Sequence, residues 1–213
     1  MEHKKIGYYD YTVVLTYIGM LSAVSGIFMV MNQNYIMAVI LLMAAGLCDM
    51  FDGAVASTKK RSVSEKRFGI QIDSLSDLIS FGVLPAVFVY QLSGRKVHCG
   101  IISALFILAA LIRLAFFNVL EEERQSIDPG SKSFFLGVPV TTIAIILPIV
   151  YTLFVKCLLK HTFWFTLMLV VTGIGFITPV KIKKPESLGK VIILVIGIAE
   201  VAGIAFVMKG GSL

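Results

Sequence analysis

The stretch CDMFDGAVASTKKRSVSEKRFGIQIDSLSDLISFGVLP, residues 48–85, decides how the rest of the chain is interpreted. It contains four aspartates, and each lies at the edge of a strongly apolar run: Asp49, Asp52, Asp73 and Asp77. On helices, the first two share one face because they are three residues apart, and the last two share one face because they are four apart. The pattern predicts two antiparallel helices that present their carboxylates to each other.

Carboxylates at bilayer depth are costly, at about 2.5–3.5 kcal/mol each at the centre of a membrane-inserted helix. Two facing pairs therefore need neutralisation. Hard divalent cations prefer oxygen ligands, so Mg²⁺ or Mn²⁺ is the expected partner. The stretch predicts a carboxylate site for one or two such ions, and the competing explanation is structural ion pairing with nearby basic residues.

The composition is that of a membrane protein. Of the 213 residues, 57% are hydrophobic and 15% are charged, whereas soluble domains are typically about 45–50% apolar and about 25% charged. Several apolar runs approach the roughly 20 residues that cross a bilayer. Barrel strands would alternate over about 10 residues, which these runs do not. We expect an all-α polytopic bundle of transmembrane helices that forms one domain over residues 1–213.

The apolar runs give seven candidate spans within an expected range of about six to eight. They cover residues 12–31, 35–56, 69–92, 99–119, 135–154, 162–179 and 191–208. Residues 57–68 are interpreted as a basic loop. If the N-terminus is cytoplasmic, thirteen Lys and Arg residues lie on the inside and five on the outside. Because cytoplasmic loops carry the excess of basic residues, we expect the N-terminus and the four aspartates at the cytoplasmic side of a cell membrane.

The net charge of +6 and the three cysteines add little to this interpretation. Basic residues in short loops set topology and meet anionic lipid. We expect no nucleic-acid partner, because no basic face is interleaved with exposed aromatics. The cysteines are scattered without metal-ligand spacing, so neither disulfides nor zinc are expected.

Small residues surround the predicted carboxylate site. Gly53 follows Asp52 and lets a ligand approach the backbone closely, Ala56 keeps the same region narrow, and Gly69 opens the facing helix. Metal ions clamp and neutralise phosphoryl oxygens, and the loop of residues 59–67 adds positive charge. Together these features indicate a nucleotide diphosphate or a lipid diphosphate.

The motif Asp49-x-x-Asp52-Gly53-x-x-Ala56, followed by Gly69-x-x-x-Asp73-x-x-x-Asp77, resembles the signature of the CDP-alcohol phosphotransferases. These are integral membrane enzymes of phospholipid synthesis. Three further segments are similar to the phosphatidylserine synthase branch: LSD with SFGV-PA at residues 75–86, RLA-FN at residues 113–118, and GVP at residues 137–139. The resemblance covers about residues 46–140.

The resemblance implies roles for these residues. The metal ligands, for two ions of Mg²⁺ or Mn²⁺, would be Asp49, Asp52, Asp73 and Asp77. Asp77 would also be the general base. The cytidine diphosphate site would comprise Asp49, Gly53, Ala56, Ser57, Lys60 and Gly69. Ser57 stands where the family usually has an Arg that holds the diphosphate, and Lys59, Lys60 or Arg61 are candidates to replace it.

For the acceptor, Arg113 inside an apolar run is expected to bind the carboxylate of L-serine through its planar fork. Its alternatives are a structural pair with a nearby carboxylate and extension of the side chain to the membrane interface. Further polar contacts are expected from Ser76, Ser80 and Asn118. The branch often has a second Arg where this chain has Phe116.

The expected function is metal-dependent transfer of a phosphatidyl group from CDP-diacylglycerol to L-serine, in the lipid bilayer, by a homodimer. Glycerol 3-phosphate, inositol phosphate or choline are the alternative acceptors. A membrane prenyltransferase is a further alternative, but its acidic pairs are usually four residues apart in both halves. A cation transporter is the non-enzyme alternative, but such sites lie near the bilayer midplane between internal repeats.

Overall fold

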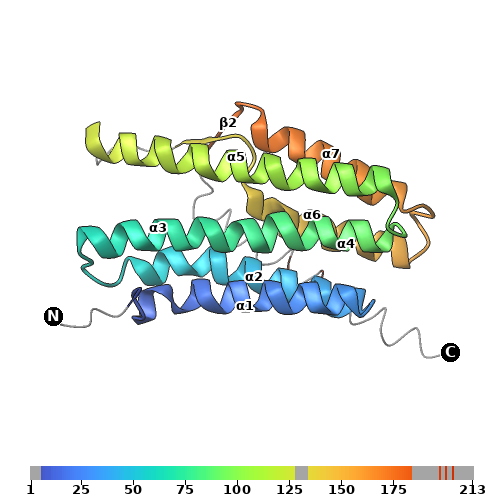
Figure 1. Cartoon of the computed structure of the whole chain (residues 1–213), viewed down its shortest axis with the longest axis horizontal. Coiled ribbons are helices and arrows are strands. Elements are labelled where there is room, and N and C mark those ends of the chain that lie inside the picture. The colour runs from blue at the N-terminus through green and yellow to red at the C-terminus, as the bar shows by residue number, and fades with distance from the viewer. Residues whose placement is uncertain (1–5, 128–133, 184–196, 198–199, 201–202, 204–213) are drawn as a thin grey trace.

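The computed structural model describes residues 6–127 and 134–183, with positions 197, 200 and 203. Apart from one short pair of strands, the described elements are helical (Figure 1). In chain order they are α1 (Tyr11–Met31), α2 (Tyr35–Ala56), α3 (Val63–Asp77), the π-helical η1 (Leu78–Val83), α4 (Leu84–Leu92), α5 (Val97–Ile127), β1 (Phe134–Leu136), the 3₁₀-helical η2 (Val140–Thr142), α6 (Ile143–Val155), α7 (Phe163–Ile177) and β2 (Lys181–Lys183). The all-helical bundle predicted from the apolar runs is confirmed.

Four helices are long and apolar enough to cross a membrane: Tyr11–Met31, Tyr35–Ala56, Val63–Leu92 and Val97–Glu123. They run along one long axis (Figure 1). Their outer faces carry large exposed apolar side chains, such as Ile18 and Leu21 on α1 and Leu105 and Ile112 on α5. Such apolar faces are suited to contact with the lipid hydrocarbon. The chain is a multi-pass membrane protein.

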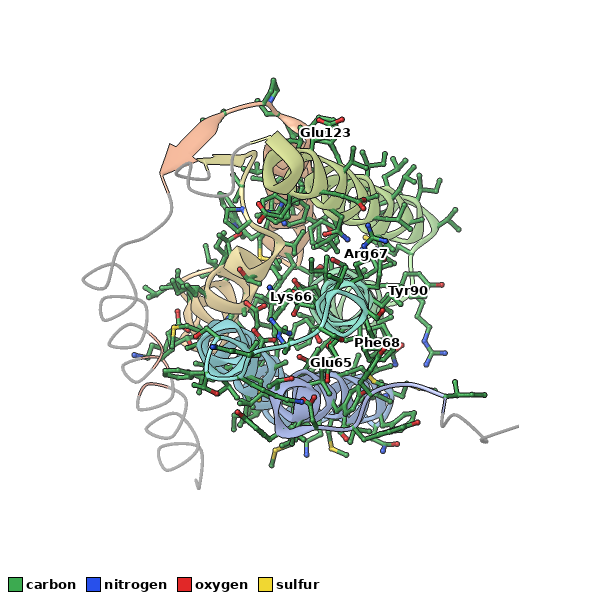
Figure 2. The ribbon with its side chains drawn as sticks, turned by 90° about the vertical axis from the view of Figure 1, so that its left-hand side faces the viewer. Glu65, Lys66, Arg67, Phe68, Tyr90 and Glu123 are labelled. Carbon is green, nitrogen blue, oxygen red and sulfur yellow. The ribbon has the colours of Figure 1, made fainter. Side chains whose placement is uncertain are left out.

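The third predicted span begins earlier than expected, because part of the predicted basic loop is helical. Ser62 caps α3, since its hydroxyl accepts from the Glu65 N–H and the Glu65 carboxylate accepts from the Ser62 N–H. This reciprocal capping box starts a helix irrespective of hydropathy. Lys66 and Arg67 therefore lie on the first turns of α3 rather than in a loop, at the end of the bundle that faces the viewer in Figure 2.

The helix α5 also extends beyond its apolar run. It was expected to end near Val119 and continues to Ile127. Its extension runs beside the start of α3, where Arg67 and Glu122 form an ion pair of 3.7 Å with both side chains about three-quarters exposed. Such a pair contributes little to stability. Both helices thus project beyond their apolar segments at the same end of the molecule (Figure 1).

The fifth and sixth predicted spans are shorter helices than the sequence indicated. Gly137 has φ +79°, and a Cβ there would lie 2.6 Å from the Phe176 carbonyl oxygen, so the chain turns tightly against α7. Before this turn β1 pairs antiparallel with β2. Helix α6 has 13 residues and α7 has 15, fewer than the roughly 20 that cross a bilayer. The predicted seventh span, 191–208, lies outside the described residues except for positions 197, 200 and 203.

An aromatic cluster joins the helices away from the aspartates. The Phe88 ring packs edge-on against Tyr35 and Tyr151, at 5.4 and 5.6 Å between centroids, and lies 6.1 Å from Phe165. These side chains come from α4, α2, α6 and α7. Edge-to-face contacts add to the stabilisation from burial. The cluster fixes the relative positions of α2 and α4, and with them the helices that carry the aspartates.

Candidate active site

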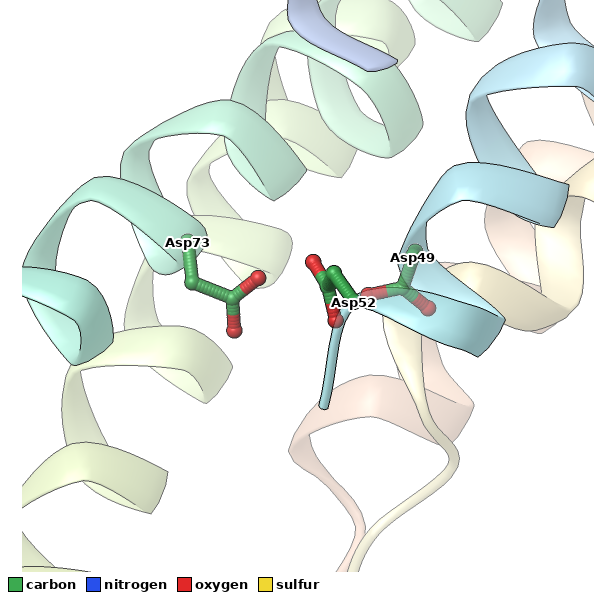
Figure 3. A group of neighbouring side chains, drawn as sticks. All are labelled: Asp49, Asp52 and Asp73. Carbon is green, nitrogen blue, oxygen red and sulfur yellow. The ribbon is translucent and has the colours of Figure 1, made fainter. Parts of the chain in front are cut away.

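The four predicted aspartates come together between two neighbouring helices. Asp49 and Asp52 lie in the last turns of α2, and Asp73 and Asp77 in the last turns of α3. One carboxylate oxygen from each of Asp49, Asp52 and Asp73 lies within 4.8 Å of the other two (Figure 3). The helical spacing predicted the faces, and they meet because α1 packs against both helices while α2 contacts η1 and α4, which continue α3.

Asp77 borders the same small cavity of about 10 Å³, which is room for a water-sized species. Asp49, Asp52 and Asp73 line it too, so all four carboxyl groups gather around one space. Adjacent carboxylates repel each other, and a bound cation would relieve that repulsion. The π-helical segment η1 begins directly after Asp77, and such segments frequently occur at functional sites.

The donor set suits a divalent cation. Mg²⁺ binds oxygen at about 2.0–2.1 Å, so opposite ligand oxygens of one ion stand about 4 Å apart. The three clustered carboxylates already approach this separation. No cationic side chain borders the cavity among the described residues. The site could therefore hold a divalent ion on Asp49, Asp52 and Asp73, with Asp77 adjacent.

Helix α1 contributes a residue that sequence reasoning missed. The Thr16 hydroxyl donates to Asp52 Oδ2 at 3.2 Å and borders the cavity. Helix α1 approaches closely here because Gly19 faces α2, where a Cβ would lie 3.2 Å from the Cys48 Cβ. The span also contains the hydroxyls of Thr12, Tyr17, Ser22 and Ser25, so nothing in the sequence was a reason to select Thr16 among them.

The two motif glycines differ in their surroundings. A Cβ on Gly53 would have no neighbouring atom within 4 Å, so packing within the described structure does not require a glycine there. A Cβ on Gly69 would lie 2.9 Å from Arg61 Nη1. Gly69 therefore provides the space into which the Arg61 guanidinium extends. Ala56 ends α2 on the same side of the molecule.

The basic loop offers three cations, and they have different environments. The Lys59 ammonium donates to Asp10 at 2.8 Å and to Glu65 at 3.2 Å. The hydrogen bond from Lys59, together with those from the Thr12 hydroxyl and N–H, lowers the pKa of Asp10 to about 2. Lys59 therefore ties the segment before α1 to the start of α3. Lys60 is exposed, and Arg61 extends over Gly69 as described.

Ser57, at the position of the missing Arg, is the C-cap of α2. Its hydroxyl donates to the Ala54 carbonyl at 2.6 Å. The side chain is exposed and short. It lies next to the predicted diphosphate site but supplies no positive charge there.

Arg113 is buried in α5 with 8% of its surface exposed. Its guanidinium carbon lies 5.2 Å from the centroid of the Phe117 ring, and its charge interacts with Asp77 and Asp49. A buried arginine is costly unless anionic groups compensate it. The structure thus places Arg113 beside the aspartates, as both its functional and its structural interpretation require.

The three remaining predicted acceptor residues separate into two groups. Ser76 and Ser80 are buried and border the cavity, although the Ser76 hydroxyl already donates to the Thr16 carbonyl at 3.3 Å. Asn118 instead pairs with Ser74, which it contacts at 2.9 and 3.1 Å. Asn118 thus joins α5 to α3 and does not border the cavity.

Comparison with known proteins agrees with this geometry. The family model for CDP-alcohol phosphatidyltransferase matches residues 12–178. The chain is similar to the CDP-diacylglycerol–serine O-phosphatidyltransferases of Saccharomyces cerevisiae, with 32% identity over 147 residues, and of Helicobacter pylori, with 34% over 138 residues. These matches cover 63% and 64% of this chain, and 52% and 53% of the relatives.

A third relative is the archaetidylserine synthase of Methanothermobacter thermautotrophicus, with 36% identity over 132 residues, covering 60% of this chain and 53% of the relative. The chain spans about half the length of the curated relatives it matches. The family match, in contrast, includes α1 to α7 almost in full and all four aspartates. The chain belongs to the CDP-alcohol phosphatidyltransferase family.

Proposed function

We propose that the protein transfers the phosphatidyl group of CDP-diacylglycerol to the hydroxyl of L-serine, giving phosphatidylserine and CMP. The observation that carries the proposal is the meeting of four carboxylates from α2 and α3, flanked by an unobstructed Gly53. The names of the relatives supply the acceptor. Two are named for the transfer from CDP-diacylglycerol to serine, and one is named for making archaetidylserine. The three names differ in the lipid but share serine.

The donor would bind with its diphosphate against the aspartate site and its acyl chains in the bilayer. Asp49, Gly53, Ala56, Ser57, Lys60 and Gly69 are the proposed contacts of the cytidine diphosphate. Arg61 joins them, because its guanidinium already occupies the space that Gly69 leaves open. A planar guanidinium can make two parallel hydrogen bonds to a phosphate. Arg61 would thus replace the cation that Ser57 lacks.

Asp49, Asp52, Asp73 and Asp77 would hold Mg²⁺ or Mn²⁺, most simply as two ions. Bound divalent ions neutralise phosphoryl oxygens and stabilise the leaving group of such a transfer. The protein's own share is to hold the carboxylates in place. Thr16 contributes by donating to Asp52, which fixes the orientation of that ligand.

Asp77 would act as the general base. A serine hydroxyl is a poor nucleophile near neutral pH, and a carboxylate within hydrogen-bonding reach can take its proton during attack. The serine oxygen forms a bond to the β-phosphorus, the phosphoanhydride bond breaks, and its electron pair leaves with CMP. Arg113, buried beside Asp77, would bind the serine carboxylate, with Ser76, Ser80 and Asn118 as further proposed acceptor residues.

The same proposal places the active site at the cytoplasmic face of a cell membrane, in a homodimer of a single domain. Its support is the excess of basic residues at the ends that carry the aspartates, including Lys66 and Arg67 on α3. The cytidine nucleotide, a soluble product, would then be released into the cytoplasm.

The test is CMP release by the purified full chain with CDP-diacylglycerol and Mg²⁺ or Mn²⁺. L-serine, glycerol 3-phosphate, inositol phosphate, choline and no acceptor are compared, with Asp77→Asn as the inactive variant. Release that needs serine and is lost in Asp77→Asn is expected. Release with a different acceptor alone would overturn the assignment of serine, and no release with any acceptor would favour a cation transporter.

A further inference from the structure

A second cavity lies at the end of the bundle opposite the aspartates, at the right-hand end in Figure 1. It has a volume of about 460 Å³, within the range of about 300–1,000 Å³ typical of small-molecule sites. It lies between the turn that joins α4 to α5 and the beginning of α7. Ser93 follows Asp77 by 16 residues, which is about 24 Å of helix. The cavity is therefore separate from the proposed active site.

The cavity is basic at its edge and apolar inside. Lys96, His98 and His161 are exposed at its border. Ile102 and Phe163 supply apolar surface. Among the described residues no carboxylate borders it. An ammonium and two imidazoles can all donate hydrogen bonds to an anion.

Two helices begin at this cavity. Helix α5 starts at Val97 and α7 at Phe163, and residues of both first turns border the space. Thr162, before α7, makes no side-chain capping hydrogen bond. The first N–H groups of a helix lack partners within it, and its N-terminal end carries partial positive charge. In α7 the Trp164 and Phe165 N–H groups already donate to the His161 and Thr162 carbonyls, so this end contributes its partial positive charge to an anion between the two helices.

A buried hydroxyl provides the independent observation. Ser93 is 5% exposed and borders the cavity, and its Oγ has no hydrogen-bond partner in the part of the chain that the structure describes. An unsatisfied buried hydroxyl costs about 1–3 kcal/mol, which a ligand can recover. Its neighbour Thr166 is different, because that hydroxyl lies 3.6 Å from Cys99 Sγ.

We propose that this cavity binds a phosphate-bearing anion, with Ser93, Lys96 and His161 as its polar contacts. The basic edge and the two helix ends recognise the phosphate, and the apolar interior has room for a hydrocarbon portion. Phosphate chemistry at a membrane surface has two sources, a phospholipid head group or a free phosphate, and the experiment separates them.

The full chain in detergent is titrated with dioctanoyl phosphatidylglycerol, with inorganic phosphate, and with dioctanoylglycerol, which has the same chains and no phosphate. Trp164, the single tryptophan, reports binding by fluorescence because it adjoins the bordering residue Phe163, at 6.0 Å between ring centroids. Native mass spectrometry counts the bound molecules. The variants are Ser93→Ala and the double variant Lys96→Ala/His161→Ala. The matched control is Lys156→Ala, which removes an exposed cation at the same end that does not border the cavity.

The double variant is expected to bind the phosphate-bearing probe at least about tenfold more weakly, the loss of one or more charge-assisted hydrogen bonds. Ser93→Ala should weaken it severalfold, and Lys156→Ala by less than about twofold. The thermal midpoint of each variant shows that it is folded. If the double variant weakens the binding of inorganic phosphate, the ligand is a free anion. If it weakens the binding of phosphatidylglycerol alone, the ligand is a lipid head group. The proposal is overturned if neither probe responds to the double variant, if Lys156→Ala has an equal effect, or if dioctanoylglycerol shows the same dependence.

Discussion

Replacing Gly53 with alanine separates the needs of the fold from those of the ligand. The added methyl group would have no neighbour within 4 Å, so it strains nothing in the described structure. Gly53 lies within α2, and alanine is favoured over glycine inside a helix by about 0.5–1 kcal/mol. The thermal midpoint should therefore rise, by about 1–4 °C for a chain of this size.

The effect on catalysis should have the opposite sign. If the donor diphosphate lies against the Gly53 backbone, the methyl group occupies space that the ligand needs. Such overpacking typically costs about 1–3 kcal/mol, which corresponds to a loss of about 5- to 150-fold in kcat/KM for CDP-diacylglycerol. The KM for serine should change little, because none of the proposed serine contacts, Arg113 among them, lies within 4 Å of the added methyl group.

The assay is steady-state CMP release at varied CDP-diacylglycerol, together with thermal unfolding of the same preparation. Ala54→Gly is the matched control. It lies one residue further along α2 and is exposed, so it should lower the thermal midpoint and leave kcat/KM within about twofold. An unchanged kcat/KM in Gly53→Ala would refute the close approach of the ligand. A lower thermal midpoint would show that the fold itself needs the glycine.

Three further predictions concern charge, ligand orientation and topology. Arg61→Ser should raise the KM for CDP-diacylglycerol at least about tenfold, and Lys60→Ser by a smaller factor, since Arg61 extends over Gly69 and its guanidinium can make two hydrogen bonds to the diphosphate, whereas the exposed Lys60 ammonium is a single point charge. Thr16→Val should lower the apparent affinity for Mn²⁺ about 10-fold, because it removes the hydrogen bond to an aspartate ligand; the measurement is a metal titration of CMP release. Cys157 is exposed in the turn between α6 and α7, and this turn lies at the right-hand end of the bundle in Figure 1. A membrane-impermeant maleimide should therefore label it in intact cells and should not label Cys157→Ser.

Each of these has a clear contrary result. Equal effects of the two loop substitutions would assign the diphosphate to general positive charge rather than to Arg61. An unchanged metal titration in Thr16→Val would make its hydroxyl a packing contact only. Labelling of Cys157 only after the cells are opened would reverse the proposed orientation and place the aspartates on the outer side.

The sequence predicted the parts of the site that follow from local periodicity. Asp49 with Asp52, and Asp73 with Asp77, share helix faces by spacing alone, and the bounds of α2 were predicted as residues 35–56. Two such pairs on antiparallel helices are expected to face each other, because a cation held between them offsets the repulsion of their charges. The core of the site could therefore be predicted without any knowledge of tertiary contacts.

What the sequence did not reveal depends on contacts between distant segments. Thr16 reaches Asp52 only because α1 packs closely on α2. Asn118 resembled an acceptor residue but is held by Ser74. The start of α3 was missed for a local reason, because the charged turn after Ser62 has low hydropathy although it contains a complete capping box. Hydropathy indicates which residues enter the membrane and does not mark where a helix starts.

The segment from Val63 to Leu92 is one continuous 30-residue helical rod, with η1 as its only described π-helical part. Its first half carries two of the aspartates, and Ser93 at its far end borders the second cavity. A rigid helix transmits rotation about its own axis. A ligand that rotates one end would therefore change the orientation of side chains at the other end, unless the wider π-helical turn absorbs the rotation. Thermodynamic linkage makes any such effect mutual. The sites at the two membrane surfaces would then be coupled through a single helix, and the stiffness of η1 would set the strength of that coupling.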